Sequence, residues 1–220
     1  MPAKPSRMPL ADLVSRARTA VTNARADAEV AAALAPFGID APRLDALLDL
    51  VEDVEARMGA QASEYAEQYA ATSAASAARA DLDALYARHR QLARLVHPRG
   101  GDAYRSLSLG GTPPDGTPAL LAAADVFYRV LATTPALVSP LARYRVDAAA
   151  LAAGQAKVEA LRAAVAAQAR ETGDAQRATA VRDDAANRLR AAYGDLVTVA
   201  RMALADLPQA RERLGLLERS

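Results

Sequence analysis

The chain has 220 residues, of which 27 are basic and 26 acidic, and it contains no cysteine or tryptophan. Without cysteine there are no disulfides, thiolate metal sites or cysteine nucleophiles, and two histidines cannot build a histidine-rich metal centre. A formal net charge of +1 gives no overall field that attracts nucleic acid or anionic lipid. No apolar stretch approaches the roughly 18 uninterrupted residues of a membrane-spanning helix.

Alanine accounts for 58 residues, and leucine and arginine are the next most frequent. These residues are strong helix formers, and the alternating pattern of strands is nearly absent, so the sequence predicts an all-α fold. Alanine buries little apolar area, which favours closely approaching helices. The excess of alanine, with lysine only at positions 4 and 157, is typical of a GC-rich bacterial genome.

The first segment, residues 1–10, contains three prolines and two basic residues without a following apolar run. This pattern is not that of a secretory signal, and it predicts a short disordered arm on a cytoplasmic protein. A helix is expected after Pro9, where apolar residues recur at three-to-four spacing up to Ala28. Gly38 and Asp40 then form a stop-and-start signal, with Gly38 ending one helix and Asp40 capping the next.

Two further amphipathic runs follow, over residues 44–69 and 82–96. The second of these runs ends at His97-Pro98. Residues 100–117 are rich in glycine, proline, serine and threonine, and they are the one segment predicted to be a linker.

Comparing the chain with itself at an offset of 107 positions reveals an ungapped internal repeat. Over residues 37–96, nineteen positions are identical to the residue 107 positions later, and ten of these pairs are not alanine. These ten are Asp40 with Asp147, Leu44 with Leu151, Val51 with Val158, Glu52 with Glu159, Gln61 with Gln168, Glu64 with Glu171, Thr72 with Thr179, Leu82 with Leu189, Tyr86 with Tyr193, and Arg94 with Arg201.

The repeat predicts an internally duplicated antiparallel helical bundle, made of two three-helix repeats over residues 11–99 and 118–220. Gly173-Asp174 interrupts the second long run and aligns with Ala66-Glu67, so a turn is expected at both places. Two such halves, related by a pseudo-twofold axis, would share one core.

Polar residues that match between the repeats are candidates for a polar pocket. The alternative is that these groups satisfy one another inside the bundle and fix the helix register, and this alternative is favoured. The matched candidates are Gln61, Glu64, Tyr86, Gln168, Glu171 and Tyr193, and the pocket would also be reached by Tyr65 and Tyr69, which have no identical counterpart.

The densest basic segment is a candidate anion contact formed by Arg88, Arg90, Arg94 and Arg99. The alternative is that these cations gather at a helix C-terminus, where the helix dipole favours them. His89 and His97 lie within this basic segment, which disfavours a metal cation. The acidic residues at positions 45, 49, 52 and 53 are typical of a solvated helix face.

These patterns contain no catalytic motif and predict no cofactor or metal. The function expected is that of a non-enzymatic interaction or scaffold protein that binds itself or another protein. Two alternatives stay open: peripheral binding to a lipid or polymer-granule surface through amphipathic helices, and small-molecule binding in a pocket between helices. Binding of nucleic acid is not favoured.

Overall fold

A computed structural model of the chain describes residues 8–216 and is 85% helical, with no strand among the residues described. The all-α prediction is therefore confirmed. The elements in chain order are α1 (Leu10–Ala26), α2 (Ala28–Leu34), the 3-10 helix η1 (Ala35–Phe37), α3 (Ala41–Val96), α4 (Asp102–Ser106), α5 (Thr117–Thr133), α6 (Pro135–Val138), the 3-10 helix η2 (Ser139–Tyr144), α7 (Ala148–Ala203) and α8 (Pro208–Arg213).

Several helix boundaries lie where the sequence places them. Helix α1 begins directly after Pro9, and residues 1–7 of the predicted N-terminal arm lie outside the described residues. Gly38 adopts a left-handed conformation with φ of 79°, and the Asp40 carboxylate accepts a hydrogen bond from the Arg43 backbone N–H at 3.1 Å. The break at Asp27 is not predicted by the pattern, and the Asp27 side chain caps α2 by accepting hydrogen bonds from the N–H groups of Glu29 and Val30.

The two long helices are continuous, and the turns predicted near Ala66-Glu67 and Gly173-Asp174 are absent. Helices α3 and α7 each contain 56 residues. Residues 66–80 contain no glycine or proline, and a single glycine inside a helix costs only about 1 kcal/mol relative to alanine. Gly173 therefore weakens α7 locally without ending it, and the prediction of two three-helix repeats is wrong in this respect.

The chain packs as two compact units rather than around the single core that was predicted. The first unit combines residues up to Tyr65 with those from Asp174 onward, and the second unit is Ala66–Gly173. Each unit therefore takes part of its helices from the N-terminal half of the chain and part from the C-terminal half.

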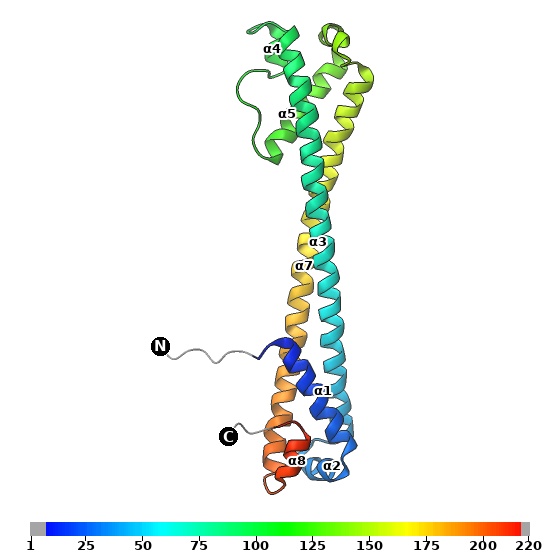
Figure 1. Cartoon of the computed structure of the whole chain (residues 1–220), viewed down its shortest axis with the longest axis vertical. Helices are drawn as coiled ribbons and strands as arrows, with labels where there is room; N and C mark the ends of the chain where they lie inside the picture. Colours follow the sequence, from blue (N-terminus) through cyan, green and yellow to red (C-terminus); the bar gives the residue numbers. More distant parts are fainter. Residues whose placement is uncertain (1–7, 217–220) are drawn as a thin grey trace, which may run out of the picture. The chain divides into compact units, whose positions relative to one another are not determined.

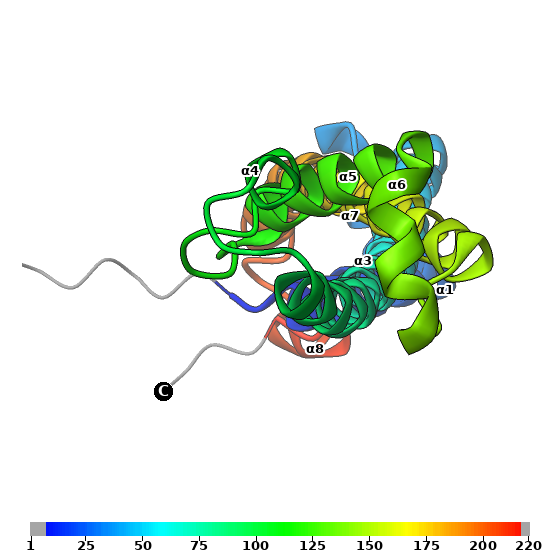
Figure 2. The same cartoon turned by 90° about the horizontal axis from the view of Figure 1, so that it is seen from above.

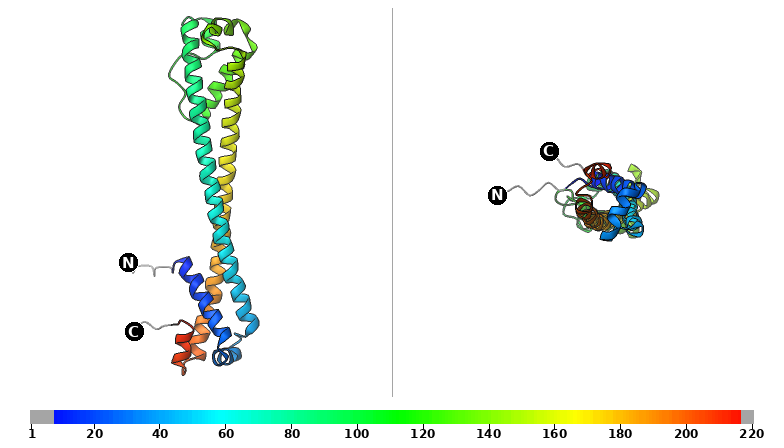
Figure 3. Two further views of the ribbon diagram at one scale, coloured as in Figure 1. Left: turned by 45° about the vertical axis from the view of Figure 1, so that its right-hand side comes forward. Right: turned by 90° about the horizontal axis from the view of Figure 1, so that it is seen from below.

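The first unit contains α1, α2, α8, the beginning of α3 and the end of α7 (Figure 3). Its apolar side chains form two clusters. In one cluster, Leu13 and Ala17 of α1 pack with Val54 of α3 and Leu189 of α7. The other cluster joins α1 and α2 to the last turns of α7 and to α8. Many members are alanine or valine, so the helices approach closely, as the composition predicts.

The second unit contains α4, α5, α6, η2, the end of α3 and the beginning of α7 (Figures 1 and 2). Its core is aromatic at the centre, where the Phe127 ring of α5 packs edge-on against Tyr86 of α3 and against Tyr128 of α5. The segment 100–117 is more ordered than a linker, because it contains α4 and because Leu107 and Leu109 are fully buried in this core.

No single helix among the described residues is both long and apolar enough to cross a membrane, although the bent pair Thr117–Thr133 and Pro135–Tyr144 passes that test together.

Candidate functional site

The candidate polar residues separate into several local groups. Gln61 of α3 is buried, and its amide nitrogen donates to the Thr179 hydroxyl of α7 at 2.9 Å while its amide oxygen accepts from Arg182 at 2.6 Å. The Thr179 hydroxyl donates to the Ala175 carbonyl, so it acts as the acceptor for Gln61 and for the Tyr65 hydroxyl at 3.2 Å. These groups satisfy one another across two helices of the first unit.

The second unit repeats this contact with the partners exchanged. Gln168 of α7 donates to the Thr72 hydroxyl of α3 at 3.3 Å. Gln168 and Thr72 lie 107 positions from Gln61 and Thr179 respectively. The matched polar residues therefore connect α3 to α7 in each unit, which agrees with a role in fixing helix register.

The other tyrosines of the candidate pocket do not join these groups. Tyr69 is 73% exposed, whereas Tyr86 is buried in the second-unit core and Tyr193 packs against the first-unit cores. Burial raises the pKa of Tyr86 and of Tyr193 above the ordinary value, although nearby arginines act in the opposite direction. Both phenols are therefore neutral at physiological pH.

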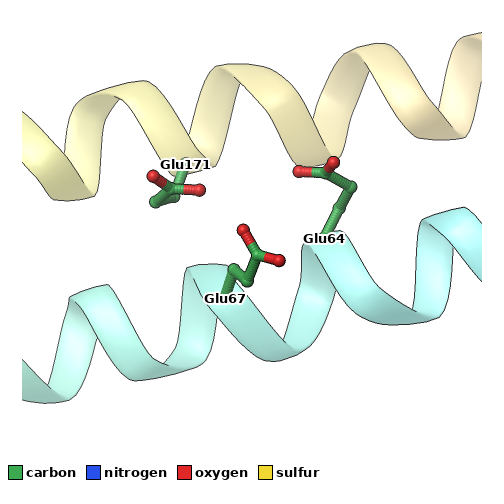
Figure 4. A group of neighbouring side chains, drawn as sticks. All are labelled: Glu64, Glu67 and Glu171. Carbon is green, nitrogen blue, oxygen red and sulfur yellow. The ribbon is translucent and has the colours of Figure 1, made fainter.

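The candidate glutamates lie at exposed or half-buried positions. In the first unit, Glu64 borders a cavity of about 200 Å³ that Arg57 and Arg177 also line. In the second unit, carboxylate oxygens of Glu67 on α3 and Glu171 on α7 lie within 4.8 Å of each other, and both side chains project between the helices (Figure 4). A pair of acidic groups alone does not make a metal site.

The basic segment divides into two structural arginines and two exposed ones. Arg90 is only 5% exposed, and its Nη2 donates to the carbonyl oxygens of Leu109, Gly110 and Gly111 at 2.8–3.3 Å. Arg94 donates to the Leu109 and Gly111 carbonyls, both at 2.6 Å.

The exposed pair, Arg88 and Arg99, makes no hydrogen bond or ion pair within the described part of the chain. Two of the four arginines of the candidate anion contact, Arg90 and Arg94, therefore bind backbone carbonyls of the glycine-rich loop instead of facing solvent as a free anion site. A sequence cannot reveal this, because backbone carbonyls carry no residue-specific signal.

We expect Arg90→Met to lower the free energy of unfolding by about 2–3 kcal/mol, since hydrogen bonds to a charged group contribute about 1.5–3 kcal/mol each. Arg88→Met is the matched control and should change stability by less than about 0.5 kcal/mol. Urea denaturation measures both, and limited proteolysis should cut the loop at residues 110–116 faster in Arg90→Met. Equal stability of the two variants would refute the anchoring role of Arg90.

A buried polar contact lies in the centre of the second unit. The Tyr128 hydroxyl and the His89 Nδ1 are 3.2 Å apart, and both side chains are buried. Burial, with a smaller contribution from Arg88, lowers the pKa of His89 below its ordinary value, and burial raises the pKa of Tyr128. Both groups are neutral at physiological pH, and the contact is part of the packed interior of the second unit. His97 is likewise buried, with Nε2 at 3.2 Å from the Leu137 carbonyl.

Two large apolar side chains at equivalent places in the repeat are exposed to solvent. Leu95 near the end of α3 is 66% exposed, and Met202 near the end of α7, 107 positions later, is 58% exposed. Around Met202, Val199 lies one turn earlier on α7 and lines a cavity of about 480 Å³ together with Phe37, which is 50% exposed. Large apolar residues repeated on the surface are candidates for a contact with another protein.

Comparison of the chain with family models, with curated proteins and with solved structures finds no match. The proposals below therefore rest on the residues and on their geometry.

Proposed function

We propose that the chain is a tandem duplication whose two halves interleave to form the two units. Support comes from the helix bounds: α1 and α5 each begin and end 107 positions apart, and so do α3 and α7. Positive φ angles recur at the same offset, in Gly38 and Arg145 and again in Ser108 and Gly215. Each residue of the second-unit core also has a counterpart 107 positions away in the first-unit clusters.

We propose further that the protein is a non-enzymatic interaction protein that associates with a second copy of itself through two related surfaces, one in each unit. The observation that carries this proposal is the exposure of Leu95 and Met202 at equivalent positions.

Sedimentation velocity at increasing protein concentration tests this proposal. We expect the unaltered chain to form dimers or larger species over about 1–100 µM, a range typical of weak protein contacts. Leu95→Lys and Met202→Lys should each weaken association, and together they should leave a monomer. Lysine suits these positions because cations are favourable in the last turn of a helix.

Tyr69→Lys is the matched control, since Tyr69 is 73% exposed but lacks an apolar counterpart, Gln176 being the residue 107 positions later. It should leave association unchanged. A chain that stays monomeric at every concentration, or association that Tyr69→Lys weakens as much as Leu95→Lys does, contradicts the proposal.

A further inference from the structure

The second unit contains an apolar cavity of about 500 Å³ bordered by α5, α6, η2 and the first turns of α7. Its apolar lining includes Leu131, Val138 and Ala152, and its polar groups are the Ser139 hydroxyl and the Gln155 amide. Pockets for small molecules usually measure about 300–1,000 Å³ and combine an apolar lining with a few polar groups. The cavity fits this description in size and in composition.

The first unit fills the corresponding place with its own side chains. Two of the residues that line the cavity, Ala132 and Ala152, lie 107 positions after Arg25 and Asp45. In the first unit, Arg25 Nη2 and Asp45 Oδ1 form an ion pair at 3.0 Å. In the second unit two alanines stand in place of this arginine and aspartate, so no side chain of that size covers the cavity from these two positions.

The lining determines the kind of molecule that suits the cavity. It includes no charged side chain among the described residues, so nothing would offset the cost of removing an ion from water. The Ser139 hydroxyl and the Gln155 amide make no hydrogen bond within the described part of the chain, and both are therefore available to a ligand. A hydroxyl and an amide can each donate to or accept from a neutral polar group.

We propose that this cavity binds a neutral, mainly apolar small molecule that carries one hydroxyl or carbonyl group. The apolar part lies against Leu131, Val138 and Ala152, and the polar group bonds to Ser139 or Gln155. This site is independent of the association surfaces proposed above, and its lining contains none of the candidate polar-pocket residues of the sequence analysis.

The test is a fluorescence titration of the full chain with N-phenyl-1-naphthylamine, a neutral apolar probe. We expect saturable binding at one site, with displacement of the probe by decanol and much weaker displacement by decanoate, which has the same chain length but a charge. Equal competition by decanoate would overturn the proposed ligand class, and the absence of saturable binding would overturn the site.

Two closing variants, which fill the cavity with larger side chains, test whether the probe binds there. Ala132→Arg with Ala152→Asp introduces the ion pair of the first unit, and Ala152→Phe fills the same space without a charge. Each should weaken probe binding about tenfold or more, which corresponds to about 1.4 kcal/mol. Arg25→Ala with Asp45→Ala is the matched control in the first unit and should leave the affinity of the second-unit site unchanged.

Circular dichroism of each variant is the check that the helices remain. Unchanged affinity in either folded closing variant would overturn the assignment of the site to this cavity.

Discussion

Gly154→Ala is expected to destabilise the protein by about 3 kcal/mol, although glycine-to-alanine changes inside helices normally stabilise by about 0.5–1 kcal/mol. Gly154 lies within α7, and a β-carbon added there would overlap the ring of Tyr128. For a chain of this size, such a loss corresponds to a fall in the melting temperature of roughly 6–12 °C.

The overlap cannot be relieved cheaply because Tyr128 is held on several sides. Its ring is fully buried, packs edge-on against Phe127 at 5.3 Å between centroids, and places its hydroxyl beside His89. Moving the ring would open a void and would leave a buried hydroxyl without its partner, each of which costs free energy.

The first unit has different residues at the two positions that correspond to Tyr128 and Gly154. Positions 107 before Tyr128 and Gly154 are Val21 and Leu47, which belong to one apolar cluster. In the second unit the large Tyr128 on α5 faces Gly154 on α7. In the first unit the smaller Val21 on α1 packs with the larger Leu47 on α3. We therefore expect the losses from Gly154→Ala and Tyr128→Val to be less than additive in the double variant, since removal of the ring removes the clash while leaving a void of its own.

Gly194→Ala is the matched control, since Gly194 lies in the same helix and no atom lies within 4 Å of its added β-carbon. This control should gain about 0.5–1 kcal/mol in thermal or urea unfolding. The packing account fails if Gly154→Ala is as stable as Gly194→Ala, or if Tyr128→Val adds its own loss without compensation.

Local features of the fold could be predicted from the sequence because their causes are local. Alanine and leucine favour helix at every position they occupy, and Gly38 with Asp40 marks a helix end and a helix start within four residues. The start of α1 after Pro9 follows from the same kind of signal. Helix α7 continues through Gly173, contrary to the predicted turn, because the strong helix formers on both sides outweigh one weak local interruption.

The features that could not be predicted depend on contacts between distant residues. Nothing in the pattern around Arg90 shows that it binds carbonyls about twenty residues later, and nothing around Gly154 reveals the ring of Tyr128. The cavity beside Ala132 could not be predicted either, because it depends on which helices border that position. Nor does the sequence show that the counterparts, Arg25 and Asp45, form an ion pair in the first unit. The match at an offset of 107 positions is visible in the sequence, whereas the interleaving of the two halves that we propose is not.

Separation of the chain into its two halves is expected to abolish the monomeric fold of each half. A cut after Thr112 lies in the exposed glycine-rich loop and gives fragments 1–112 and 113–220. Fragment 1–112 retains Leu34 and Leu44 of the first-unit core but lacks Leu196 and Leu204. The second unit is divided in the same way. Each fragment alone would expose to water its part of both apolar cores. The burial free energy lost in this way exceeds the free energy of unfolding of a typical domain.

The most direct test of the interleaved duplication is co-expression of the two fragments, followed by light scattering and thermal unfolding. The account predicts that fragments 1–112 and 113–220 purify together as a one-to-one complex with the helicity of the intact chain. Each fragment alone should be unfolded or dimeric. A fragment that stays monomeric, is as helical as the intact chain and unfolds cooperatively on its own would contradict the account.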